Sequence, residues 1–225
     1  MAAREISKAW KGGIRDLILV HGAGSFGHPL VVKYGLRGRI TSAEQKLGVS
    51  ITHESCGVLS SAFVWALHKQ KVPAIAIPPA MMIVQKNQRI CSFGKIVHEL
   101  LGSEYLPVLY GDVVPDQELG FSVCSGDQLV SYLGKQADSI ALGTNVDGVL
   151  DSEGKIINSI TKKNFADVLR HLKPVAGDVT GGMEGKLWEL LDMKTHAHIF
   201  NATVPGRIED ILKGEKTIST KVSAD

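Results

Sequence analysis

The stretch that decides the fold class is LILVHGAGSFGHP, residues 17–29, in which an apolar run leads directly into a glycine-rich loop. Leu17–Val20 is apolar at every position, as expected for a strand that is covered on both faces. The loop that follows, residues 21–28, carries three glycines, which let backbone N–H groups approach an anion closely. The combination predicts a buried strand with a ligand loop at its carboxyl end.

Further apolar runs alternate with amphipathic stretches, an order that favours an α/β fold with a mainly parallel sheet. The expected strands are Leu17–Val20, Ala74–Ile77, Val108–Tyr110, Ser139–Leu142 and His198–Asn201. The expected helices are Ser42–Gln70, with an interruption, then Lys95–Leu101, Asp127–Lys135, Asn164–Leu172, Met183–Lys194 and Arg207–Lys213.

Two hairpins are expected to interrupt this alternation. In the first, Met82–Gln85 and Arg89–Phe93 flank residues 86–88, and in the second, Val149–Leu150 and Ile156–Ile157 flank residues 151–155. No repeat, low-complexity segment or linker divides the sequence. We therefore predict a single domain over residues 1–225.

Composition excludes several classes of protein. Of 225 residues, 44% are hydrophobic and 21% charged, and the net charge of +2 provides no basic field for nucleic acid. The most apolar stretch, Val72–Val84, is too short to span a membrane and contains three prolines. Three cysteines at no metal-ligand spacing, and no secretory signal in Met1–Trp10, favour a cytoplasmic protein.

The glycine loop also matches a dinucleotide-binding pattern, since Gly22, Gly24 and Gly27 fit G-x-G-x-x-G. That interpretation requires a second strand that ends in an acidic residue about 20 positions on. Glu44 stands at a tolerable distance, but Thr41–Glu44 has the pattern of a helix N-cap with no strand before it. The nicotinamide interpretation is therefore disfavoured, and the loop is better explained as a phosphate cradle.

Histidines flank this loop. His28 would stand at the start of the following helix, where an imidazole can donate a hydrogen bond to a phosphate oxygen. A lone histidine is more often a surface or capping residue, but its position after the glycines favours a functional role. His21, at the strand end, is assigned a structural role.

Two short motifs follow later strands. Gly111-Asp112 comes after Val108–Tyr110, at a strand's carboxyl end, where open α/β sheets bind ligands. Ser125-Gly126-Asp127 opens a helix. Ser125 could be only an N-cap. Alternatively, Asp127 organises a catalytic site and Gly126 admits the substrate.

Two longer motifs complete the set. TNVDGV, residues 144–149, comes after a buried strand, and its polar groups could hold a nucleotide or form only a hairpin turn. DVTGGMEGK, residues 178–186, is a glycine-rich loop that enters a helix and places Lys186 one turn inside it. Backbone amides and a lysine suit the β- and γ-phosphates of ATP. The sequence contains no Walker A, protein-kinase or hydrolase motif, and we leave His196, His198, Cys56 and Cys124 as structural residues.

Together, HGAGSFGHP, GD, SGD, TNVDGV and DVTGGMEGK, in this order, resemble the amino-acid kinase superfamily, most closely its isopentenyl phosphate kinase branch. The resemblance implies a three-layer αβα sandwich with an open, mainly parallel central sheet. About 1–124 would form the acceptor-binding half and about 125–225 the ATP-binding half. The implied reaction transfers the γ-phosphoryl group of ATP, with Mg²⁺, to isopentenyl phosphate and gives isopentenyl diphosphate.

The resemblance also implies roles at the acceptor. His28 would bind the acceptor phosphate and stabilise the transferring group, while Ala23 and Gly126 would contact the acceptor through their backbone. Asp127 would organise the site. An apolar pocket would hold the prenyl tail, and its candidate residues, which could equally be core residues, are Val49, Ile51, Val58, Leu59 and Phe63.

On the ATP side the resemblance implies that Gly24, Gly182 and Lys186 hold phosphates and that Asp147 lies on the nucleotide. It implies no protein ligand to a metal. This superfamily often dimerises, so a homodimer is expected, with a small-molecule substrate, no nucleic acid and no membrane insertion.

One family feature has no counterpart. Family members begin with a strand and a loop that carry a lysine and a Gly-Gly-Ser turn, whereas Lys11-Gly12-Gly13 follows the helix-like stretch Ala3–Trp10 and has the pattern of a helix stop. Two alternatives follow: a truncated form that is weakly active or inactive and acts by binding only, or a kinase of related small phosphates or phosphonates.

Overall fold

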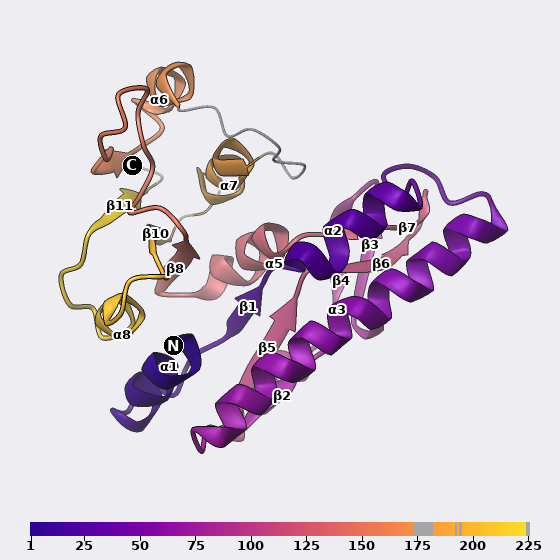
Figure 1. The fold of residues 1–225 in the computed structure, drawn as a ribbon, viewed down its shortest axis with the longest axis horizontal. Helices are drawn as coiled ribbons and strands as arrows, with labels where there is room; N and C mark the ends of the chain where they lie inside the picture. The colour runs from indigo at the N-terminus through magenta and orange to yellow at the C-terminus, as the bar shows by residue number, and fades with distance from the viewer. Residues whose placement is uncertain (173–181, 192, 194, 224–225) are drawn as a thin grey trace. The chain divides into compact units, whose positions relative to one another are not determined.

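The computed structural model describes residues 1–172, 182–191, 193 and 195–223, and its contacts form two units (Figure 1). One unit contains residues 15–129, and the other joins residues 1–14 to residues 130–225. The functional halves expected from the sequence remain a prediction.

The run at Leu17–Val20 contributes β1 (Leu19–His21) to a parallel sheet in the unit of residues 15–129. The strand order is β1-β5-β2, with β5 (Leu106–Tyr110) in the centre and β2 (Ala74–Ala76) beyond it. All residues of β5 are buried, because this central strand has neighbours on both edges and helices on its faces. The parallel alternation expected from the sequence is confirmed here.

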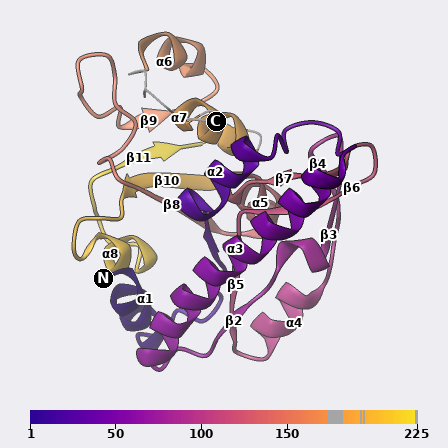
Figure 2. The same cartoon turned by 45° about the vertical axis from the view of Figure 1, so that its right-hand side comes forward.

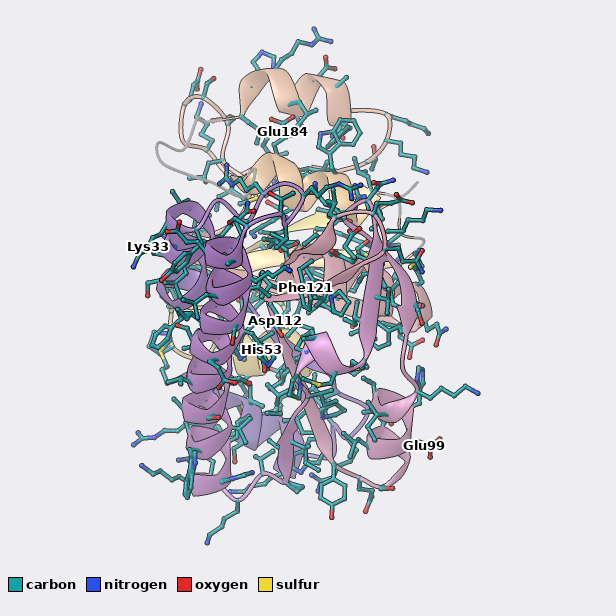
Figure 3. All side chains as sticks on the ribbon, turned by 90° about the vertical axis from the view of Figure 1, so that its right-hand side faces the viewer. Lys33, His53, Glu99, Asp112, Phe121 and Glu184 are labelled. Atoms are coloured by element: carbon teal, nitrogen blue, oxygen red, sulfur yellow. The ribbon has the colours of Figure 1, made fainter. Side chains whose placement is uncertain are left out.

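The helices of this unit are α2 (Gly24–Lys33), α3 (Ala43–Lys69), the short η1 (Pro79–Met81) and α4 (Ile96–Gly102). Figure 3 shows α3, which carries His53, and α4, which carries Glu99, on opposite sides of the strands. Both helices contact β5.

The predicted interruption of α3 is wrong, because the helix runs without a break for 27 residues. Its glycine at position 48 serves packing instead: a Cβ atom there would lie 2.4 Å from the side chain of Tyr34, so glycine lets α2 approach. The helix starts with a capping box, in which Gln45 N–H donates to Ser42 Oγ at 3.0 Å and Ser42 N–H donates to Gln45 Oε1 at 3.2 Å.

A second sheet of this unit has the order β4-β3-β6-β7 (Figure 2). The first predicted hairpin is confirmed as β3 (Ile83–Lys86) and β4 (Arg89–Phe93). A further hairpin joins β6 (Asp112–Asp116) to β7 (Gly120–Cys124), and β6 is not among the strands expected from the sequence. Two aspartates and a proline conceal β6, since these residues are depleted in strands.

Asp116 ties the turns of both hairpins together. Its carboxylate accepts hydrogen bonds from the N–H groups of Asn87, Gln88, Glu118 and Leu119 at 2.8–3.3 Å, and from the Ser122 hydroxyl at 2.8 Å. Burial acts to raise the pKa of Asp116, but the hydrogen bonds, led by that from Gln88, outweigh it and lower the pKa to about 2.

The other unit is built on the sheet β8-β10-β11-β9. Its strands are β8 (Ser139–Thr144), β10 (His196–Asn201), β11 (Ser219–Val222) and β9 (Ser159–Ile160). Only β10 and β11 pair in antiparallel fashion. The core combines sheet residues such as Ile140 and Ile199 with Leu187 and Leu190 of a helix.

The helices of this unit are α1 (Ala2–Lys11), α6 (Phe165–His171), α7 (Gly182–Leu191) and α8 (Arg207–Leu212), with a 3-10 turn, η2 (Gly134–Gln136). In the chain order, α5 (Gly126–Leu133) follows β7, and it begins one residue earlier and ends two residues earlier than the predicted Asp127–Lys135. The second predicted hairpin exists only as an isolated bridge between Leu150 and Ile156.

The helix-like start of the sequence is α1, which packs on α8. Glu5, which is 5% exposed, accepts hydrogen bonds from Gly206 and Ile208 N–H at 3.0 Å each. These bonds satisfy N–H groups at the N-terminus of α8, which otherwise have no acceptor within the helix.

The α/β fold class with mainly parallel pairing is therefore confirmed, with the strands distributed over three sheets. Of the helices in the described part of the chain, none combines the length and the apolar character needed to cross a membrane.

We predict that Asp116→Asn lowers the free energy of unfolding at pH 7 by about 2 kcal/mol. Because folding lowers the pKa of Asp116, the ionised carboxylate stabilises the folded state fully at pH values above its ordinary pKa of 3.8. This stabilisation is lost as the pH falls toward the folded-state pKa of about 2. Urea unfolding at pH 7, 4 and 2.5 measures the difference, which should shrink at low pH. The exposed Asp138→Asn is the control, and an equal effect of the two substitutions would contradict the assignment.

Candidate active site

Three of the sequence motifs meet at Gly111. Parallel pairing places His21, the last residue of β1, opposite Tyr110, the last of β5, so the loops after both strands start side by side. Gly111 N–H donates to the His21 carbonyl at 2.9 Å. A Cβ atom on Gly111 would lie 3.2 Å from the nitrogen of Ala23 and 3.5 Å from that of Gly126, so only glycine leaves these backbone groups uncovered.

Both of these nitrogens lie at the start of a helix. Ala23 is the N-cap of α2, and Gly126 is the first residue of α5. N–H groups in a first turn have no acceptor within their helix, and the helix dipole adds positive potential there. Two helix N-termini that converge on one glycine form a site suited to an anion such as a phosphate group.

The structure places His28 in the helix, not at its start. It is the fifth residue of α2 and is half-buried. The expectation of a helix-start position is wrong because α2 begins inside the glycine loop, at Gly24. His28 therefore lies one turn beyond the amides of the cradle.

The start of α5 confirms the capping interpretation of Ser125, and the functional roles of Gly126 and Asp127 remain a prediction. Ser125 is a cap, since its hydroxyl oxygen accepts a hydrogen bond from Gln128 N–H at 3.2 Å. Asp127 lies in the first turn and is half-buried. The cap and the predicted functional residues thus share one helical turn.

His21 belongs to an aromatic cluster. Its ring stacks on Tyr110 with centroids 5.6 Å apart and meets the edge of Phe63 at the same separation. Burial lowers its pKa, and among the residues that the structure describes its buried Nε2 has no hydrogen-bond partner. These contacts agree with the structural role predicted for His21.

The sequence analysis missed a buried pair beside the cradle. His53 Nδ1 lies 2.9 Å from an oxygen of Asp112, whose side chain is fully buried and also accepts from Val113 and Ala80 N–H. Burial raises the pKa of Asp112, and His53 opposes the increase. The two residues are 59 positions apart, and neither belongs to a motif that indicates the other.

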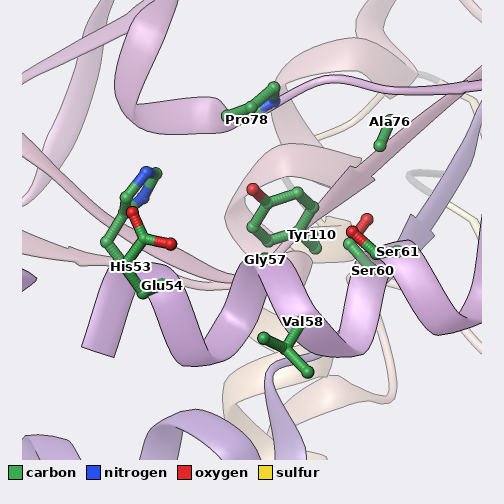
Figure 4. A pocket seen from close by; sticks show the side chains of 9 residues that line it. All are labelled: His53, Glu54, Gly57, Val58, Ser60, Ser61, Ala76, Pro78 and Tyr110. Carbon is green, nitrogen blue, oxygen red and sulfur yellow. The ribbon is translucent and has the colours of Figure 1, made fainter. Parts of the chain in front are cut away.

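His53 also lines a pocket of about 390 Å³ between α3 and the end of β2 (Figure 4). Its walls are His53, Glu54, Gly57, Val58, Ser60, Ser61, Ala76, Pro78 and Tyr110. Of the residues predicted for an apolar pocket, Val58 lines this one, whereas Val49 packs in a core cluster and Phe63 packs against His21. Ser60 Oγ is buried in the described structure without a hydrogen-bond partner.

The remaining predicted residues lie in the unit built on β8. Asp147 follows β8 and accepts hydrogen bonds from Arg207 and, at 3.1 Å, from Asn201. The bond from Arg207 and then that from Asn201 lower the pKa of Asp147. Gly182 opens α7, and Lys186, which is half-buried, is its fifth residue, while Asp178–Gly181 of the same motif lie outside the described residues.

Metal-ligating groups are dispersed. Over the described ranges, no three His, Cys, Asp or Glu side chains gather in a way that could hold a metal ion. In the part of the chain that the structure describes, Cys56, Cys91 and Cys124 form no disulfide.

An α/β fold whose helix N-termini converge at the ends of parallel strands is the class of protein suited to binding phosphate groups. The model of the amino acid kinase family matches residues 1–201, and the chain belongs to this family.

Its relatives include isopentenyl phosphate kinases of two archaea. That of Methanothermobacter thermautotrophicus is 35% identical over 92% of this chain and 84% of its own. That of Methanocaldococcus jannaschii is 34% identical over 88% and 78%. An X-ray structure of isopentenyl phosphate kinase superimposes with a TM-score of 0.84 at 32% identity, over 99% of this chain and 88% of its own.

Proposed function

We propose that this protein is an isopentenyl phosphate kinase, which transfers the γ-phosphoryl group of ATP to isopentenyl phosphate and forms isopentenyl diphosphate. The observation that carries the proposal is the approach of the Ala23 and Gly126 nitrogens at Gly111. The similarity to isopentenyl phosphate kinases over most of the chain supports the choice of acceptor.

In this proposal the acceptor phosphate accepts hydrogen bonds from Ala23 and Gly126 N–H. His28 binds a phosphate oxygen and stabilises the group in transfer, and Asp127 organises the site from the first turn of α5. Phosphoryl transfer requires little covalent help from a protein, so alignment and charge stabilisation by such groups account for catalysis.

ATP would be held by Gly24, Gly182 and Lys186 at its phosphates and by Asp147 at the nucleoside. Asn201 and Arg207 both donate to Oδ1 of Asp147, and the other carboxylate oxygen would accept a hydrogen bond from a ribose hydroxyl. Mg²⁺ would enter with ATP and neutralise phosphate charge, as it commonly does in kinase sites with few protein ligands. The dispersed carboxylates of the described residues fit a metal held largely by the nucleotide.

The prenyl tail would occupy the pocket beside Tyr110. This tyrosine directly precedes Gly111 and packs with Ala23, so the pocket lies next to the proposed phosphate site. Val58, Ala76, Pro78 and the Tyr110 ring provide apolar contacts for a short hydrocarbon chain.

A homodimer is part of the proposal, and α3 provides a surface for it. Leu47, Val58 and Trp65 are each more than half exposed. Spacings of 11 and 7 residues place them on one face of the helix. An apolar stripe of this kind can meet its own copy across a two-fold axis. We also place the protein in the cytoplasm, with no nucleic-acid partner, in agreement with its small net charge.

The proposal predicts that His28→Ala and Lys186→Ala each lower kcat by about 10²–10³-fold, because each removes a donor to the transferring phosphates. Steady-state assays with ATP, Mg²⁺ and isopentenyl phosphate measure this effect, with the exposed His171→Ala and Lys163→Ala as controls. Undetectable turnover by the wild type at saturating substrates would overturn the proposal. A clear preference for another phosphate or a phosphonate would replace the acceptor.

Filling the pocket tests where the tail binds. We expect Ala76→Leu to raise the KM for isopentenyl phosphate by about tenfold and to leave the KM for ATP unchanged, because the added methyl groups would occupy tail space. Ala66→Leu on α3, whose residue does not line the pocket, is a size-matched control. If Ala76→Leu leaves the acceptor KM at its wild-type value, the tail binds elsewhere.

The dimer surface is tested by Trp65→Glu. A charge in the centre of an apolar interface is left unpaired on association, so we expect the variant to sediment as a monomer at concentrations where the wild type is a dimer. The exposed Trp188→Glu on α7 is the control. A monomeric wild type, or a dimeric Trp65→Glu, would count against this surface.

A further inference from the structure

We propose that Gln128 and Gln85 are positioning residues for the acceptor phosphate: they fix the first turn of α5 to the β3–β4 hairpin, and thereby place the N–H group of Gly126. This inference rests on the proposed function for its chemical consequence. The hydrogen bonds from which it is argued join residues between positions 85 and 128.

Gln128 lies one residue after Asp127 and closes a capping box with Ser125. Its backbone N–H donates to Ser125 Oγ at 3.2 Å, and its side-chain Oε1 faces Ser125 N–H at 3.4 Å. A capping box holds the N-cap residue and the third residue of the helix together through reciprocal bonds. Gly126 and Asp127 are the two residues between them.

The same side chain bonds to the hairpin. Gln85 Nε2 donates to Gln128 Oε1 at 3.0 Å, and Gln128 Nε2 donates to the carbonyl oxygen of Gln88 at 2.9 Å. Because the amide accepts on one side and donates on the other, its orientation is determined. The start of α5 is therefore bonded to β3 and to the turn that follows it.

Gln85 is in turn held from behind. It is fully buried on β3, and its Oε1 lies against the Ser122 hydroxyl, whose single proton is shared between Gln85 and Asp116, the latter at 2.8 Å. Asp116 holds the turns of both hairpins through backbone N–H groups. A buried polar chain of this kind is rigid because each unpaired member would be costly.

Gly126 itself has no side chain that could anchor it. A Cβ atom at this position would lie 3.5 Å from the His21 carbonyl oxygen, an ordinary van der Waals distance, so the residue lies next to β1. Its position must therefore be fixed by its neighbours in the turn, and the side chain of Gln128 reaches the hairpin. A small displacement of Gly126 N–H would weaken its hydrogen bond to a phosphate oxygen.

The chain offers a matched control in the second capping box. Gln45 caps α3 with Ser42 in the same way and also donates to a carbonyl, that of Gly35, at 3.1 Å. Substituting Gln45 removes the same kinds of hydrogen bonds from the start of α3, a different helix from the one that carries Gly126. It separates loss of a cap from displacement of Gly126.

The experiment compares Gln128→Met, Gln85→Leu and their double variant with Gln45→Met. We expect the first two to raise the KM for isopentenyl phosphate by about tenfold and to leave the KM for ATP within twofold. The double variant should be no worse than the more severe single one, because both act through one chain of bonds. Gln45→Met should lower the melting temperature by about as much as Gln128→Met does, but it should leave the KM for isopentenyl phosphate unchanged.

Hydrogen exchange of residues 125–129 provides a readout that needs no turnover. Gln85→Leu, about 40 positions away, should accelerate exchange in this segment, whereas Gln45→Met should not. If Gln85→Leu does not fold, Ser122→Ala removes only the hydroxyl bonded to Gln85 and should change exchange in the same direction. The inference is overturned if the two single variants change neither the exchange of residues 125–129 nor the KM for isopentenyl phosphate. It is also overturned if the effects of the two substitutions on this KM multiply in the double variant. If the wild type is inactive but Gln85→Leu still accelerates exchange in residues 125–129, the proposed function is rejected. The role of Gln85 and Gln128 in positioning the start of α5 is then retained.

Discussion

The parallel pairing of β1 with β5 is the interaction on which the candidate site depends. It aligns His21 with Tyr110, and the hydrogen bond from Gly111 N–H to the His21 carbonyl carries this alignment one residue past the strands. The loops that follow are consequently held against one another. A glycine at 111 then leaves the nitrogens of Ala23 and Gly126 close to a shared space. An anion there would meet the backbone N–H groups of two helix N-termini.

The strand β6 shows how local donors decide the ionisation of buried carboxylates. Asp112 and Asp116 stand at its two ends, and both side chains are buried. At Asp112, burial outweighs the hydrogen bonds and His53, so the pKa rises. At Asp116, four backbone N–H groups and a hydroxyl outweigh burial, so the pKa falls. At one end of β6, Asp112 holds His53 beside the pocket. At the other end, Asp116 holds the two hairpin turns.

Polar bonds, more than apolar packing, connect the candidate site to the rest of its unit. The aromatic cluster of His21, Phe63 and Tyr110 packs at the ends of β1 and β5, where the loops of the cradle begin. The position of α5 relative to the hairpins, however, is set by amide side chains with defined orientations. Directional bonds suit this task, because phosphoryl transfer is sensitive to small displacements, which apolar contacts resist less specifically.

The sequence by itself determined the order of strands and helices, the α/β class and the motifs. These features depend on local patterns: the apolar run before HGAGSFGH, the cap at Ser42, and the glycines that leave amides accessible. Only the tertiary structure decided that α3 continues through Gly48, since the reason is the side chain of Tyr34. It also decided that His28 lies inside α2, that β6 exists, and that His53 meets Asp112 and Gln85 meets Gln128. The physical reason is the same in each case: hydrogen bonds and contacts between residues far apart in the chain leave no periodic pattern in the sequence, because they depend on where the backbone brings each partner.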